Sequence, residues 1–179
     1  MVRLFVAIDL PPEIREQIKD SQQELKKSRA RLSLVNPEII HITMKFIGEV
    51  EKDAVESIKK KLDNILDSPF EVQVTGISAD NPRRPRVVWC TIDDQGRCAQ
   101  LHERIEDALF PLGIKKEGRK FRPHATVARV KRFDSTLIES IRPLVSVPYG
   151  NFIINGFTLK KSTLTPTGPI YEDIMEVRW

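Results

Sequence analysis

The chain has few cysteines, histidines and aromatic residues, and it has no long apolar run. Of its 179 residues, two are cysteine, three are histidine and 7% are aromatic. No stretch approaches the roughly 18 consecutive apolar residues of a membrane-spanning helix, so no membrane association is expected. The N-terminal segment MVRLFVAIDLPPEI has only a short apolar run and no small-residue cleavage site, which argues against a secretory signal.

The two cysteines exclude further classes of protein. Cys90 and Cys98 match neither a disulfide framework nor a metal-ligand spacing, and no His-Glu-x-x-His helix is present. We therefore expect structural thiols in a reducing, cytoplasmic environment. We also expect no metal and no other cofactor.

Composition and charge indicate one folded domain. Hydrophobic residues make up 40% of the chain and charged residues 30%, and no Pro/Gly/Ser-rich linker or low-complexity tract interrupts it. The length suits a single domain, or two small lobes joined tightly, over residues 1–179. The net charge of +4 leans towards an anionic partner such as RNA, although lysine-rich helix surfaces give the same value.

Hydrophobic periodicity predicts strands and helices in mixed order. Strands are expected at 4–10, 41–48, 70–77, 86–92 and 122–130 and within the last 29 residues. Helices are expected after Pro12, where Ile14, Ile18, Gln22 and Leu25 recur at helical spacing, and at 53–66, about 97–110 and 134–145. The order has no strict strand–helix–strand rhythm. It therefore favours an α+β fold with antiparallel sheet over a doubly wound parallel fold.

Two strands carry the same polar pattern. The stretch RPHATVARV places His124 and Thr126 two residues apart, and HITMKFIG does the same with His41 and Thr43. Side chains at i and i+2 of a strand point to the same side of a sheet. The copies lie 83 residues apart (124 − 41), close to half the chain, as two similar lobes would require.

Two such pairs, if they face each other, suit metal-free phosphodiester hydrolysis. A neutral imidazole can take a proton from water while a protonated one donates a proton to the leaving oxygen. A threonine hydroxyl beside each imidazole can hydrogen-bond a phosphate oxygen. Two readings compete with this one: a zinc site that includes His41 and His124, and a purely structural role in which each His caps a strand and each Thr is a β-former.

The chain resembles the 2H phosphoesterases, and among them the RNA 2′,3′-cyclic phosphodiesterases, also called 2′-5′ RNA ligases. The resemblance rests on RLFVAIDLP, HITMKFIGEV, PRVVWCTI, FRPHATVARV and LKKSTLTPTGPIYEDI, and covers nearly the whole chain. It implies a bilobal, pseudo-twofold α+β fold, with an antiparallel sheet in each lobe lining a central cleft, helices outside, and one His-x-Thr-x motif per lobe at 41–44 and 124–127.

The resemblance also implies a reaction, in which water opens a terminal 2′,3′-cyclic phosphate of RNA, or of a cyclic nucleotide, to a 2′-phosphate. His41 would be the proton donor to the departing 3′ oxygen, and His124 the proton acceptor that activates water. Thr43 and Thr126 would hold phosphate oxygens. Two alternatives remain: the same site run backwards as a 2′-5′ ligase, and an RNA-binding module without catalysis. A monomer is expected.

Five further residues are candidate substrate contacts. Strand alternation places Lys45 beside His41 and Thr43, and Arg122 beside His124 and Thr126, although each can equally be a solvated surface charge. The resemblance suggests a nucleotide contact for Arg129, but strict alternation puts it on the opposite face unless the strand bulges. Tyr171 and Ser162, in the C-terminal signature, are expected to help shape the cleft.

Three other side chains are assigned structural roles. Alternation turns Phe46 away from His41 and into the core. Trp89 lies in an apolar strand, where core packing is favoured over stacking on a base. His102 falls one position off the apolar stripe of its helix and is expected on the surface.

Overall fold

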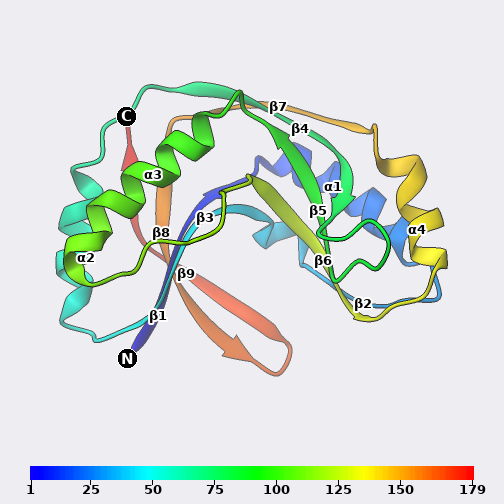
Figure 1. Ribbon diagram of the computed structural model, residues 1–179, viewed down its shortest axis with the longest axis horizontal. Helices are drawn as coiled ribbons and strands as arrows, with labels where there is room; N and C mark the ends of the chain where they lie inside the picture. The colour runs from blue at the N-terminus through cyan, green and yellow to red at the C-terminus, as the bar shows by residue number, and fades with distance from the viewer.

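The computed structural model describes all of residues 1–179 (Figure 1). The strands are β1 (Val2–Asp9), β2 (Arg31–Leu34), β3 (His41–Val50), β4 (Phe70–Ala79), β5 (Val87–Asp93), β6 (His124–Arg132), β7 (Pro148–Ile154), β8 (Gly156–Thr165) and β9 (Gly168–Arg178). The helices are α1 (Pro12–Leu25), α2 (Ala54–Asp63), α3 (Arg97–Leu109) and α4 (Thr136–Ile141), with short 3-10 turns at Pro37–Ile39, Phe110–Leu112 and Arg142–Leu144. Each expected element is present, and β2 is an additional strand.

The strands form one antiparallel sheet whose order is symmetric about its centre. The order is β7-β4-β5-β6-β3-β1-β8-β9, and β2 pairs with β6 outside this path. The two halves, one around β6 and one around β3, meet at a single pair of residues, Ile42 and Ala125. The α+β fold with antiparallel sheet is confirmed, and the sheets expected in the two lobes prove to be joined into one.

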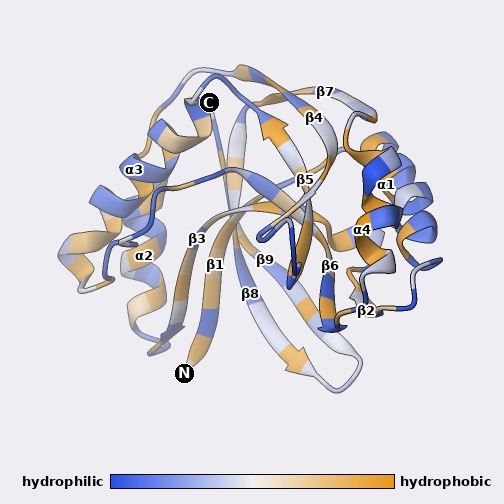
Figure 2. Ribbon diagram, turned by 45° about the vertical axis from the view of Figure 1, so that its right-hand side comes forward, coloured by the Kyte–Doolittle hydropathy of each residue, from blue (hydrophilic) through white to orange (hydrophobic).

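Helices cover the same side of the sheet in both halves (Figures 1 and 2). Helices α1 and α4 lie together beside β6 and β7, whereas α2 and α3 lie together beside β3 and β9. No helix has both the length and the apolar character needed to cross a bilayer. The helices do not cover the other side of β3 and β6. We call this side, which carries His41, Thr43, His124 and Thr126, the site face.

The core forms where apolar stripes of the helices meet the covered side of the strands. Ile14, Ile18 and Leu25 recur on one side of α1 and are fully buried. On the strands, Ile42 and Ala125 are buried by the same packing. Both cysteines are free and buried, and burial raises the pKa of both thiols, so the expectation of structural thiols is confirmed.

Each of the two central strands has a β-bulge directly after its threonine. In β3 the pairing with β1 skips Met44, and in β6 the pairing with β5 skips Val127. A bulge adds one residue and so reverses the alternation beyond it. The burial pattern is therefore the same in both strands: two half-buried positions separated by a buried one, then two buried residues, then an exposed one.

A buried helix side chain satisfies the carbonyl oxygen of each bulged residue. His102 of α3 donates from Nδ1 to the Met44 oxygen over 2.7 Å. Gln22 of α1 donates from Nε2 to the Val127 oxygen over 2.9 Å and to the Val35 oxygen over 2.7 Å. The Val127 oxygen also accepts from the Val35 N–H over 3.0 Å, so Gln22 is its second donor. A buried polar group without a partner costs about 1–3 kcal/mol, so His102 and Gln22 stabilise the backbone around the bulges. The expectation that His102 lies on the surface is wrong, because the Met44 carbonyl requires its imidazole inside.

The Gln22 amide provides a test of this arrangement. We expect Gln22→Leu to lower the free energy of unfolding by about 1–3 kcal/mol, because the side chain keeps its volume and loses both donors. Gln23→Leu, at the exposed neighbouring position, should change it by less than about 0.5 kcal/mol. Urea unfolding of both variants measures the difference, and equal stabilities would contradict the role of Gln22.

Candidate functional site

The four side chains of the two His-x-Thr motifs lie together on the site face. Because Ile42 pairs with Ala125 in antiparallel register, His41 lies opposite Thr126 and Thr43 lies opposite His124. Directly opposed side chains have Cβ atoms about 4.5–5.5 Å apart, and diagonal neighbours such as the two histidines are roughly 7–8 Å apart. All four are half-buried. The sequence pairs thus become one cluster with a twofold arrangement.

Both imidazoles are held in the same orientation by the backbone that precedes them. His41 Nδ1 lies 2.7 Å from the carbonyl oxygen of Ile39, and His124 Nδ1 lies 2.8 Å from that of Arg122. A carbonyl oxygen only accepts, so Nδ1 carries the hydrogen in both rings. The lone pair of each neutral ring is therefore on Nε2, which in His41 lies 3.0 Å from Thr43 Oγ1.

Burial lowers the pKa of both imidazoles, but the surrounding charges differ. For His41, burial lowers the pKa, whereas the hydrogen bond to Ile39 and the Asp9 carboxylate raise it, and Lys160 and His124 lower it. For His124, burial lowers the pKa, the hydrogen bond to the Arg122 carbonyl raises it, and the Arg122 and Arg129 side chains lower it. Asp9 thus favours the protonated form of His41, while cations favour neutral His124.

Aromatic rings surround both histidines. The buried Phe5 ring lies 5.2 Å from that of His41, and Tyr171 lies edge-on to His41 at 5.5 Å. The half-buried Trp89 ring lies 4.5 Å from His124. The interpretation of Trp89 as a core residue is therefore wrong: it pairs in register with Thr126 and shares the site face.

Besides Tyr171, three of the candidate contacts fall near this cluster. Arg129 is exposed on the site face, because the bulge at Val127 reverses the alternation, and its charge acts on both His124 and Tyr171. The Arg122 side chain is exposed at the start of β6. Ser162 pairs in register with Tyr171 and so shares its side of the hairpin formed by β8 and β9.

Lys45 lies on the opposite side of the sheet, and the expectation that it faces the phosphate is wrong. The bulge at Met44 turns it into the covered side, where its side chain is 2% exposed. The same bulge turns Phe46 outward, so its predicted core position is also wrong. Phe46 is 58% exposed on the site face, with its ring 6.3 Å from Phe5. It occupies the position in β3 that Arg129 occupies in β6.

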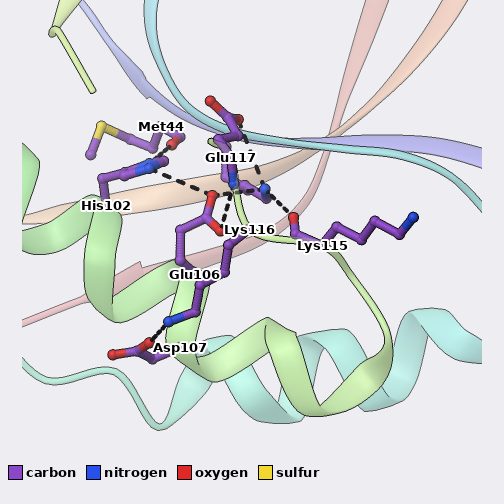
Figure 3. Close-up of polar contacts among 8 residues, drawn as sticks. Met44, His102, Glu106, Asp107, Lys115, Lys116 and Glu117 are labelled. Atoms are coloured by element: carbon purple, nitrogen blue, oxygen red, sulfur yellow. Dashed lines mark hydrogen bonds and ion pairs between the residues drawn. The ribbon is translucent and has the colours of Figure 1, made fainter. Parts of the chain in front are cut away.

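Lys45 instead joins a buried polar network that connects the two motifs. Its Nζ lies 2.7 Å from Glu106 Oε1 of α3 and donates to the Lys115 carbonyl oxygen over 2.8 Å. Glu106 also accepts from the backbone N–H of Glu117 over 3.2 Å, and lies 3.5 Å from His102 Nε2 (Figure 3). The network fastens the bulge of β3 to the loop that leads into Arg122 and His124.

One pair of charges beside His41 is not evident from the sequence. Asp9 is the register partner of His41 on β1, and Lys160 Nζ of β8 lies 2.9 Å from Asp9 Oδ2 and 2.6 Å from Asp173 Oδ1. An Asp at the end of an apolar strand is an available signal. Its proximity to a lysine near the other end of the chain is not visible without the sheet order.

The arrangement can perform acid–base chemistry on a small anion. The register sets the two imidazoles at one pair of diagonal positions and the two threonines at the other, and Nε2 is the free nitrogen of each ring. Such a set can hydrogen-bond the oxygens of one tetrahedral phosphate and move a proton on either side of it.

Comparison with known proteins assigns the chain to a family. The family model described as "LigT like Phosphoesterase" matches residues 8–89 and 92–171. The chain belongs to this family. The LigT-like chain is 36% identical to the RNA 2′,3′-cyclic phosphodiesterase of Archaeoglobus fulgidus, covering 97% of this chain and 98% of that protein. It is 37% identical to the protein of the same name from Methanocaldococcus jannaschii, over 98% and 99%. The predicted family is confirmed.

Solved structures share the fold. TT0787 of Thermus thermophilus superposes with a TM-score of 0.83 at 27% identity, covering 98% of this chain and 97% of that chain. Apo LigT of E. coli superposes with a TM-score of 0.77 at 25% identity, covering 99% and 96%.

The buried ion pair gives a prediction about stability. We expect Lys45→Met to lower the free energy of unfolding by about 3–5 kcal/mol, because Glu106 would remain charged and buried without its partner. The double variant Lys45→Met/Glu106→Gln should recover much of the loss. Lys59→Met, which removes the partly exposed pair of Lys59 with Glu56 at 2.8 Å, should cost less than about 1 kcal/mol. Urea unfolding distinguishes these outcomes. A loss of less than about 1 kcal/mol for Lys45→Met would contradict a stabilising role for the buried pair of Lys45 with Glu106.

Proposed function

We propose that this protein hydrolyses 2′,3′-cyclic phosphate ends of RNA to 2′-phosphates, without a metal, through a two-histidine acid–base site. The observation that carries the proposal is the pairing of Ile42 with Ala125, which sets both imidazoles diagonally across one small area. The names of the relatives in Archaeoglobus and Methanocaldococcus support the same substrate. The protein would act as a monomer in the cytoplasm on RNA or cyclic nucleotides.

The fixed orientation of the rings supports their roles in proton transfer. With Nδ1 bound to a backbone carbonyl in each ring, Nε2 is the atom that exchanges protons. One neutral Nε2 takes a proton from water as the water attacks phosphorus, and the other, protonated, gives a proton to the departing 3′ oxygen. The separation expected from the sheet, roughly 7–8 Å, suits a phosphate with one hydrogen bond on each side.

The charges around each ring favour His41 as the acid and His124 as the base. Asp9 stabilises the protonated form of His41, whereas Arg122 and Arg129 destabilise the protonated form of His124. Thr43 and Thr126 would donate to the non-bridging oxygens, and Arg129 would balance charge that builds up on them. Arg122, Tyr171 and Ser162 would contact the nucleotide.

The reverse reaction uses the same groups and would join a cyclic phosphate end to a 5′-hydroxyl. The acid and the base would act on water and on a 5′-hydroxyl in the same way. The high concentration of water, about 55 M, therefore favours hydrolysis over ligation.

The decisive experiment uses RNA that ends in a 2′,3′-cyclic phosphate, incubated with the protein in EDTA. We expect a 2′-phosphate product, and a loss of about 10²–10⁴-fold in kcat for His41→Ala and for His124→Ala. Thr126→Val keeps the shape, loses one donor and should cost about 10²-fold or more. Thr163→Val, an exposed control on β8, should keep full activity. An EDTA-sensitive reaction would reject the metal-free mechanism, and a module that only binds RNA would leave every variant alike.

The lowered pKa values predict the pH dependence. The base must be neutral and the acid protonated, so kcat/KM should follow a bell whose limbs report the free enzyme. Because burial lowers both pKa values below 6.5, the maximum should lie on the acid side of pH 6.5. Bound phosphate raises both pKa values, so the bell for kcat should lie at higher pH. A single sigmoid for kcat/KM would exclude catalysis by two histidines.

A further inference from the structure

Positive charge is concentrated in three segments of the chain. Residues 26–36, 81–92 and 115–133 contain 15 of the 29 lysines and arginines but only one of the 25 acidic residues, Glu117. The rest of the chain has 14 cationic and 24 acidic side chains and is therefore negative. The modest net charge of +4 hides this separation, which indicates a surface for a polyanion.

The sheet brings parts of these three segments together at the far end of β6. Strand β2 takes over as the neighbour of β6 beyond the motif, with Arg31 opposite Arg132 and Ser33 opposite Arg129. On the other side of β6, Val87 of β5 pairs with Arg129, directly after the loop that carries Arg83, Arg84 and Arg86. All of these arginines are exposed.

The register places a row of cations on the site face. Val87 shares that face with Trp89, so its partner Arg129 faces the same way as His124. A second bulge, at Lys131, then brings Arg132 onto that face opposite Arg31. The row from Thr126 to Arg132 is roughly 20 Å long at about 3.3 Å per residue.

Two of these cations are register partners of each other, and neither forms an ion pair with an acid. Like charges directly opposite in a sheet, as Arg31 and Arg132 are, destabilise it. The ion pairs nearby, Arg29 with Asp134 at 3.6 Å and Arg86 with Asp80 at 3.3 Å, do not include Arg31, Lys131 or Arg132. The charge is therefore left available for a partner.

The equivalent end of β3 lacks this excess of cations. Where β6 continues into Arg129 and Arg132, β3 continues into Phe46 and then into the exposed acids Glu49, Glu51 and Asp53, which outnumber the exposed cations beside them, Lys52 and Arg3. The histidines and threonines alone are symmetric and do not define a direction for the substrate. The charges beyond them do.

We propose that the body of a single-stranded RNA leaves the site along β6 and β2, with its phosphates on Arg31, Lys131 and Arg132. This inference rests on the proposed function, and it adds that the substrate is the end of a longer strand rather than a free cyclic nucleotide. Phosphate neutralisation by each cation releases counterions, so binding weakens with salt by about 0.7 in log–log slope per contact.

The experiment compares wild type with Arg31→Gln/Arg132→Gln, and uses Lys60→Gln/Lys61→Gln as a control. The control removes two exposed charges from α2, on the other half of the molecule. Binding of an oligouridylate of about ten nucleotides with a 3′-phosphate is measured by fluorescence anisotropy between about 50 and 200 mM salt. In parallel, kcat/KM is measured for a cyclic mononucleotide and for the same oligonucleotide with a cyclic end.

We expect the arginine variant to lose about 1.4 from the salt slope, which is about a sevenfold difference over that range of salt. Its kcat/KM should fall for the oligonucleotide and stay unchanged for the mononucleotide, while the lysine variant matches wild type on both. An unchanged slope, or an equal loss on both substrates, would overturn the inference. If no cyclic phosphate is hydrolysed but the slope still falls, the proposed reaction fails and the RNA surface stands.

Discussion

The structure depends on two β-bulges, one after each threonine of the paired motifs. Without them Lys45 would lie on the site face, and Arg129 would lie on the side covered by the helices. At each bulge a buried donor from a covering helix binds the carbonyl oxygen of the bulged residue, His102 in one half and Gln22 in the other. The same geometric solution thus appears twice with different side chains. This is evidence that the bulge, and not the donor, is what the site requires.

The frame is symmetric, whereas the charges within it are not. Asp9 and the rings of Phe5 and Tyr171 lie by His41, while Trp89, Arg122 and Arg129 lie by His124. The two equivalent imidazoles therefore have different charged neighbours, although burial lowers the pKa of both. The charges can therefore distinguish a proton donor from a proton acceptor, although the backbone around the two rings is symmetric. The buried network of Lys45 and Glu106 also ties the first strand to the loop before the second, so the two motifs share support.

Much of this could be predicted from the sequence, because period and motif are local. The fold class, the position of each long element and the two His-x-Thr pairs follow from alternation and spacing. The errors at Lys45 and Phe46 have one origin: strict alternation places both, a bulge reverses it, and nothing in MKF signals a bulge. Local pattern also misplaces His102 and Trp89, because a contact with a residue distant in the sequence fixes each of them. His102 donates to the Met44 carbonyl oxygen, and the Trp89 ring packs against the His124 ring. Strand β2 alternates polar and apolar residues, but four residues are too few for that alternation to stand out in the sequence.

The attachment of each Nδ1 to a backbone carbonyl limits how protons travel. A ring with a single free nitrogen cannot pass a proton through from one side to the other; it must return what it takes at the same atom. In the proposed reaction, one round of hydrolysis would therefore leave the proton donor deprotonated and the proton acceptor protonated. The protein would release its product in the protonation state that the reverse reaction needs, and exchange with bulk solvent would have to restore both rings before the next cyclic end is opened.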